Sequence, residues 1–311
     1  MNKTEGATFL MAYDKGNSQF SDLHFHDCAF DNCALSMVKY PQRMSRVRNV
    51  RLSKCRAVNS MIHPCLFEDV LIEDLSTNPI LLVWASFFRR VKFTGKIGKL
   101  NLNLTPTAFC QDERLLEQFA IARAAFYAET DWALDISEAK LLGLRCEGVP
   151  LHLIRRDPQT QVIVDKQGCY PGYQALGADF VKAFPGTASV LQSFDESPQQ
   201  SILLTASLAA PKARRDEEKG AITELRALGF VEEGATPAGA YAAISALSKV
   251  RRKPEPRRNT YPHPEQHDHH RPAQAARSLA LRLHPGIRLA PAFLQHVRRQ
   301  QLDGQPDQAG Q

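Results

Sequence analysis

The sequence predicts a mainly β protein: a solenoid of short parallel strands, followed by a small α/β region and a disordered tail. Three observations carry this prediction. Bulky apolar residues recur every five positions over the first third of the chain, helical periodicity is confined to a few later segments, and the composition changes abruptly near Gly234. With 311 residues, the chain has room for about two domains with cores of their own.

The five-residue repeat extends over residues 18–104, with a bulky residue at its centre and a smaller residue two positions before. An α-helix repeats every 3.6 residues or so and a strand every 2, so neither sustains a period of about five. A chain that turns a corner after each short extended segment does sustain it, and its coils stack as parallel strands. The central residues are Phe20, Phe25, Phe30, Leu35, Tyr40 and, after a two-residue insertion, Val47, Leu52, Ala57, Ile62, Phe67, Ile72, Thr77, Leu82 and Phe87.

The chain resembles the pentapeptide-repeat family over residues 18–104 and more weakly over 134–151. The family motif places Ala, Cys, Ser, Thr or Val two positions before a central Leu or Phe, as in CAF (28–30), CAL (33–35) and CLF (65–67). The Asp or Asn that usually precedes the central residue is replaced here, for example by His24, Arg46 and Leu66. The resemblance implies a right-handed, four-sided parallel β-helix with about twenty residues per coil.

Side chains one coil apart are expected to stack in columns. Counting Tyr40 as a repeat centre predicts one column of Phe20, Tyr40, Ile62 and Leu82 and another of Phe30, Leu52 and Ile72, with Cys33 above Cys55. The side chains expected inside the solenoid include Phe20, Phe25, Phe30, Val47, Leu52, Ile62 and Phe67.

The segment LHFHDCAFDNCAL (23–35) resembles a metal-binding sequence because it holds histidines, aspartates and cysteines. The repeat register points Cys28 and Cys33 inward and places the polar residues outside or at corners, so the ligand types diverge instead of converging on one ion. We therefore expect no metal and no cofactor. Thiols in an apolar interior have a raised pKa, so we also expect buried, unreactive cysteines at positions 28, 33, 55 and 65. The outward or corner residues are His24, His26, Asp27 and Asp31.

Charge is unevenly distributed around the coils. A basic belt without acids lies between Pro41 and Phe67, and an acidic group follows it. A solvated surface and a polarised docking surface both fit this pattern. Arg46, Arg51 and Arg56 each precede a central residue, so they are expected on three successive faces. The belt consists of Arg43, Arg46, Arg48, Arg51, Lys54 and Arg56, and the acidic group consists of Glu68, Asp69, Glu73 and Asp74.

Helical and hairpin signals follow the solenoid. The apolar stripe of Asp112–Ala128 predicts a helix that covers the exposed end of the coils, before one further coil at 134–151. Residues 149–168 read as a hairpin around the turn RRDP, and 201–209 is ambiguous between strand and helix. A weak polar cluster is the only concentrated polar group here: His152, Arg155, Arg156 and Asp157. Further helices are predicted at Gly177–Phe184, Thr187–Phe194 and Ala213–Leu228.

The last segment is rich in Ala, Pro, Arg and His, which predicts disorder, with one helix at Phe293–Gln301 and a histidine tract (His263, His267, His269, His270) able to bind metal loosely. It also carries the positive charge, with 12 Lys or Arg against 5 Asp or Glu from Lys249 onward, and it resembles a foreign or frame-shifted extension. The expected divisions are a lead-in (1–17), the solenoid (18–104), a helical connector or cap (105–131), a coil with an α/β region (132–232) and the tail (233–311).

The leading functional hypothesis is a non-enzymatic scaffold that binds a protein partner. No phosphate loop, nucleophile elbow, zinc-protease motif or dinucleotide fingerprint is present. An alternative is a regulator associated with DNA topoisomerase or nucleic acid; family members that resemble DNA need a long acidic rod, whereas this belt permits only weak phosphate contacts. A further alternative is an undetected activity in 132–232. No membrane span or secretory signal is evident, so a cytoplasmic location is expected.

Overall fold

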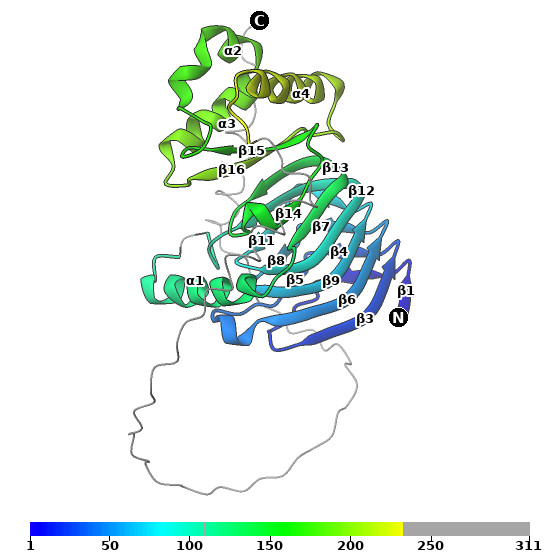
Figure 1. Cartoon of the computed structure of the whole chain (residues 1–311). Helices are drawn as coiled ribbons and strands as arrows, with labels where there is room; N and C mark the ends of the chain where they lie inside the picture. The colour runs from blue at the N-terminus through cyan, green and yellow to red at the C-terminus, as the bar shows by residue number, and fades with distance from the viewer. Residues whose placement is uncertain (109, 233–311) are drawn as a thin grey trace, which may run out of the picture. The chain divides into compact units, whose positions relative to one another are not determined.

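The computed structural model describes residues 1–108 and 110–232, and the predicted tail, with its histidine tract and its helix, lies outside them. The described part is mainly β with few helices, as expected (Figure 1). None of these helices is long and apolar enough to cross a membrane.

Ten strands form one strongly curved sheet in which all pairings are parallel, and four more form a second parallel sheet (Figure 1). The large sheet contains β1 (Asn2–Glu5), β3 (Gln19–His26), β5 (Ala34–Leu35), β6 (Ser45–Ser53), β8 (Met61–Ile62), β9 (Cys65–Glu73), β11 (Leu81–Trp84), β12 (Phe87–Asn103), β13 (Leu134–Cys146) and β14 (Ile154–Arg155). The smaller sheet contains β2 (Thr8–Leu10), β4 (Ala29–Asp31), β7 (Arg56–Val58) and β10 (Ser76–Asn78).

The chain returns to pair with itself at nearly constant intervals. Arg46 of β6 pairs with Leu66 of β9, 20 positions later, and Leu66 pairs with Phe87 of β12, 21 positions later. The interval rises to 27 between Gln19 of β3 and Arg46, because residues 36–44 leave the sheets and include the short 3-10 helix η1 (Pro41–Arg43). Parallel coils therefore continue across this excursion.

The excursion overturns the expected columns. Tyr40 lies outside every strand and is 43% exposed, so it is not a repeat centre. Phe20 pairs with Val47, and Val47 pairs with Phe67. Of the columns predicted from spacing, Leu52 with Ile72 is confirmed, but Phe30 pairs with Ala57 and not with Leu52. The column of Phe20, Tyr40, Ile62 and Leu82 is wrong, because Ile62 pairs with Val83, and Cys28 rather than Cys33 stands one coil from Cys55.

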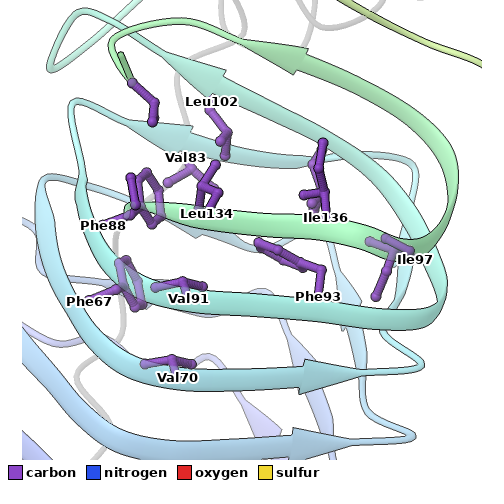
Figure 2. Close-up of a cluster of buried hydrophobic side chains, with 14 of the residues drawn as sticks. Phe67, Val70, Val83, Phe88, Val91, Phe93, Ile97, Leu102, Leu134 and Ile136 are labelled. Atoms are coloured by element: carbon purple, nitrogen blue, oxygen red, sulfur yellow. The ribbon is translucent and has the colours of Figure 1, made fainter. Parts of the chain in front are cut away.

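The expected inward residues do form part of the core of the coils. Figure 2 shows another part of this core, in which Phe67 lies beside Phe88 and Val91. Val47 and Phe67 are buried, and Phe20, Phe25, Phe30, Leu52 and Ile62 are partly buried against the same cluster. The rings of Phe67 and Phe88, on neighbouring strands, stack with centroids 5.5 Å apart. Stacking along the coil axis thus provides the core that no single five-residue segment can form.

Residues with left-handed backbone conformation make the corners, and most are Asn or Asp. These two residue types enter this region at lower cost than other non-glycine residues, because their short polar side chains bond locally. Most of them lie two positions after a central residue and about five residues from the next corner, while Ser36, Ala85 and Arg90 occupy shifted positions. The corners include Asn17, Asp22, Asp27, Asn32, Asn49, Lys54, Asn59, Asp69, Asp74 and Gly95.

Several Cys and Ser side chains two positions before a centre donate a hydrogen bond to the backbone of a neighbouring coil, as three examples show. The Cys65 thiol donates to the Ser45 carbonyl oxygen at 3.1 Å, and the Ser60 hydroxyl donates to the Phe30 carbonyl oxygen at 3.1 Å. The Cys28 thiol donates to the Thr4 carbonyl oxygen at 3.5 Å. A small donor at this position therefore links neighbouring coils while leaving room for the central side chains.

Helix α1 (Glu113–Ala128) begins at Asp112, whose carboxylate accepts a hydrogen bond from the Leu115 amide at 3.1 Å. Its apolar face packs on Phe87 and Met44. The helix does not cover the end of the coils, because β13 pairs with β12 beyond it. The expected cap is therefore a side-wall helix, inserted where Val91 pairs with Leu134.

An antiparallel ribbon, β15 (Gln161–Asp165) with β16 (Ser201–Thr205), joins two hydrophobic cores. Alternation along a strand sends neighbouring side chains to opposite faces. Ile163 and Leu203 belong to the core of the coils, whereas Val162 and Leu204 belong to a second core under the helices. The second core is built with η3 (Tyr173–Leu176), α2 (Gly177–Ala183), α3 (Pro185–Glu196) and α4 (Lys212–Ala227).

The predicted hairpin at 149–168 is wrong. The 3-10 helix η2 (Leu151–Leu153) leads into β14, which pairs with β13 of the coils, while β15 pairs with β16. The turn between them thus connects two sheets. The segment 201–209, ambiguous in sequence, supplies strand β16.

We predict that substitutions at a corner change stability through the cost of the left-handed backbone conformation and not through the loss of side-chain contacts. Asn59 has a φ of 46°. Asn59→Val should reduce the free energy of unfolding by about 1–2 kcal/mol, because a β-branched residue is disfavoured in the left-handed region. Asn59→Gly should leave stability within about 0.5 kcal/mol. Urea unfolding measures both, and equal losses would contradict a left-handed corner.

The register is tested by alanine substitution. Phe67→Ala should cost about 3–5 kcal/mol, because it removes a buried ring from a stacked column. Tyr40→Ala, the matched aromatic truncation, should change stability by about 0.5 kcal/mol or less, because the ring is exposed. A large loss of stability for Tyr40→Ala in the same unfolding experiment would contradict this register and indicate that Tyr40 is a repeat centre.

Candidate interaction surface

The basic belt follows the coils around their corners. Arg46 and Arg48 lie on β6 before the corner residue Asn49, and Arg51 lies on the same strand after it. Arg56 follows the next corner on β7. Arg46, Arg51 and Arg56 are therefore on three successive segments separated by corners, which is the arrangement expected from the sequence.

The acidic group is not a free patch. Glu68 accepts a hydrogen bond from the Arg89 guanidinium at 3.1 Å, and Glu73 accepts one from Arg51 at 2.9 Å. Asp74 accepts from a backbone amide, that of Lys96, at 2.8 Å. Each of these acids is therefore engaged by a neighbouring coil.

Asp69 has the most complete ion pair of this group. Arg90 donates to both of its carboxylate oxygens, at 2.6 and 3.1 Å. These hydrogen bonds lower the pKa of Asp69 below its ordinary value. The predicted juxtaposition of a basic belt and an acidic patch is thus replaced by ladders of paired charge between coils.

Most of the basic belt has no such partner. Arg51 is paired, but within residues 1–108 and 110–232 the other belt cations form no ion pair. All of them are exposed. Arg46, Arg48 and Arg56 lie on strands that pair on both sides, Lys54 lies at the corner between these strands, and Arg43 lies on η1 outside the sheets. The unpaired belt cations are Arg43, Arg46, Arg48, Lys54 and Arg56.

The two histidines of the ligand-like segment converge, contrary to expectation. His24 Nε2 and His26 Nδ1 lie 3.0 and 2.8 Å from the Ser53 hydroxyl. Burial, followed by the nearby Arg51 charge, lowers the pKa of His24. No third side chain completes a ligand set, and the described part of the chain contains no group of three or more candidate ligands.

The cysteines divide into buried and partly buried thiols. Cys28, Cys55 and Cys65 are buried, but Cys33 is only partly buried, which corrects the expectation for that residue. Burial raises the pKa of Cys55, and that of Cys65 lies well above its ordinary value for the same reason. Such thiols carry little thiolate at neutral pH.

The weak polar cluster does not assemble a site. The Arg155 guanidinium lies over the Trp132 ring at 4.3 Å from its centroid. Asp157 accepts from the Thr160 hydroxyl at 2.6 Å and from the Gln159 amide at 3.0 Å, which closes a turn. Burial lowers the pKa of Arg156, and His152 is exposed on η2. These residues therefore serve separate local contacts.

A cavity of about 400 Å³ that sequence reasoning missed lies between β13, α3, β16 and α4. Its charged groups are already paired: Arg214 donates to Glu218 at 2.8 Å, and Glu218 also accepts from the Ser207 amide. The apolar wall includes Val190 and Phe194 of α3. Its lining combines residues 143–147 with segments between residues 186 and 222, so no local motif marks it.

Comparison of the chain with protein-family models, with curated proteins and with solved structures finds no match in any of the three.

We predict a pH dependence of stability at His63. Burial lowers the pKa of this imidazole from its ordinary value of 6.5. Above that value the histidine is neutral in both states; as the pH falls below it, the unfolded chain takes up the proton first, so stability is lost until the pH reaches the native pKa. His63→Gln should flatten this loss in urea titrations between about pH 7.5 and 5, since glutamine does not titrate.

The exposed His152 provides the control. His152→Gln should retain the loss of stability at low pH. An unchanged pH profile in His63→Gln would contradict the buried, neutral state of His63.

Proposed function

We propose that the stacked coils are a right-handed, four-sided β-helix of the pentapeptide-repeat type, and that the protein is a non-enzymatic scaffold that binds another protein. The intervals of 20 and 21 residues between paired strands support the coil length. The corners at Asn17, Asp22, Asp27 and Asn32 support four sides, because they divide one coil into five-residue segments.

One observation carries the scaffold proposal: the four residues of the acidic group are engaged within the protein, whereas five belt cations are exposed and form no ion pair in its described part. Three of these cations, Arg46, Arg48 and Arg56, lie on strands paired on both sides, which supports fixed relative positions for them. A preformed charged surface of this kind binds a complementary partner without the cost of ordering flexible loops.

We propose no catalytic role because most of the candidate reactive side chains are either buried and protonated or used in local contacts. Burial raises the pKa of the Cys146 thiol to about 12, so it is protonated at neutral pH. In the polar cluster, Arg155 stacks on Trp132 and Asp157 closes a turn, while His152 is exposed. These roles leave no nucleophile with an adjacent base among them, which favours binding over chemistry.

The competing function is phosphate-backbone contact with nucleic acid, as in a topoisomerase-associated or nucleic-acid-associated regulator. It draws on the same cations. The belt passes around corners at Asn49 and Lys54, which limits how many of its members reach one duplex. This geometry favours a protein partner over a nucleic-acid duplex.

We predict that the full-length protein captures a specific protein from its native host through the belt. Arg46→Glu combined with Arg48→Glu should abolish recovery of that partner. Lys182→Glu combined with Lys212→Glu makes the same charge change on exposed helical positions and should retain it. Mass spectrometry of cross-linked material, with and without nuclease treatment, is the measurement.

Equal recovery by all three proteins would overturn the belt as a docking surface. Recovery that nuclease treatment abolishes would replace the protein partner by nucleic acid.

A further inference from the structure

A second cationic feature, the lysine groove, lies along the coils. Lys54, Lys96 and Lys140 line one open hollow of about 510 Å³, together with Asp74, Ser76 and Gly95. Only Lys54 and Asp74 of these residues stand out in the sequence as parts of charged groups. The groove crosses successive strands, so its members come from different coils.

The groove contains an unfavourable electrostatic arrangement. Lys96 of β12 and Lys140 of β13 are directly paired residues on neighbouring strands. Both are exposed, and like charges directly opposite each other destabilise a sheet. Neither lysine, nor Lys54, forms an ion pair within the described residues.

The one acid of the groove is held in place by the backbone. Asp74 is a left-handed corner residue and accepts a hydrogen bond from the Lys96 amide at 2.8 Å. A Cβ atom on Gly95 would lie 2.4 Å from an Asp74 carboxylate oxygen, so glycine is required beside it. Asp74 therefore stays in the groove wall and does not neutralise the three lysines through ion pairs.

We propose that the lysine groove binds an extended acidic segment of the protein partner, an inference that rests on the scaffold function. From the strand of Lys54 to that of Lys140 there are three strand spacings, about 14 Å in all. Residues i and i+4 of an extended peptide are separated by about 14 Å and point to the same side. Acidic side chains at these two positions reach Lys54 at one end and Lys96 with Lys140 at the other.

The position of Asp74 determines which residues of the bound segment fit between its two acidic side chains. It lies in the coil between Lys54 and Lys96, so the residue i+2 of the bound segment is neutral or basic. A continuous run of phosphates would place a negative charge against Asp74. The groove is also lined by lysines without an aromatic side chain, whereas single-stranded nucleic acid binds by stacking its bases on aromatic rings. Both features favour an acidic peptide.

The test uses the full chain and a fluorescein-labelled heptapeptide, Glu-Glu-Ser-Gln-Ser-Glu-Glu, in fluorescence polarisation. Lys96→Glu combined with Lys140→Glu should raise the Kd about tenfold, because exposed ion pairs are each worth about 0.2–1 kcal/mol and reversal adds repulsion. The control pair Lys182→Glu and Lys212→Glu should leave the Kd unchanged. Equal loss in both variants would overturn the groove as the binding site.

The single substitution Lys96→Glu separates binding from folding. It places opposite charges on paired positions of β12 and β13, so the Tm should rise while peptide affinity falls. A lower Tm together with lower affinity would show that the variant damages the fold and would remove the argument from paired lysines. In that case Lys96→Gln decides whether the lost charge alone weakens binding.

Two further measurements distinguish this inference from the scaffold proposal. A labelled oligonucleotide of matched length that binds more tightly than the peptide, and is lost in the same variant, would overturn the acidic-peptide assignment in favour of nucleic acid. If the captured host protein is lost on substitution of Arg46 and Arg48 but retained with Lys96→Glu and Lys140→Glu, the scaffold stands and the groove proposal is wrong.

Discussion

Parallel pairing between one coil and the next is the constraint on which the rest of this structure depends. A five-residue segment is too short to bury its own side chains or to satisfy its own backbone groups, so each segment is stable only when segments on both sides pair with it. The left-handed corners make that pairing possible, because they redirect the chain every five residues without breaking it. Asn and Asp at these corners, and small thiol or hydroxyl donors inside, are consequences of the same requirement.

Pairing also determines what the charged residues can do. Side chains at equivalent positions of neighbouring coils are held close together, so opposite charges such as Asp69 and Arg90 become ladders, and like charges such as Lys96 and Lys140 become a local conflict. Arg46, which pairs with Gln19 and Leu66, and Arg56, which pairs with Ala29 and Ser76, have only apolar or uncharged neighbours along the column. Arg48 stands opposite Glu68, but that carboxylate accepts its hydrogen bond from Arg89 instead. The strand register therefore determines which charged side chains on these coils find an ion-pair partner.

The sequence was sufficient for the repeat period, the inward residues and the mainly β class, because each depends on spacing within a few residues. It was insufficient for the register. Tyr40 lies five positions after Leu35 and looks like a repeat centre, yet residues 36–44 leave the sheets, and nothing in local spacing distinguishes the two cases.

Long insertions between paired strands prevented the prediction of the remaining contacts from the sequence. Lys96 and Lys140 pair only because helix α1 and its loops occupy the interval between them, and the helix that looked like an end cap packs on the side of the coils instead. The ribbon of β15 and β16 joins two cores through alternation, but its strands are too far apart in sequence for a hairpin signal. The sequence shows the residue types at these positions, but it does not show which strands they pair with, because that depends on how the chain folds.

Amide hydrogen exchange on the full chain tests the central claim, that pairing between coils holds every segment in register. The account predicts slow exchange, governed by one cooperative opening, for β6, β9 and β12, and fast exchange for residues 39–42 of the excursion. Protection of residues 39–42 equal to that of β6 would mean that this segment is itself a paired strand, and would contradict the register on which the interior columns, the charge ladders and the lysine groove are built.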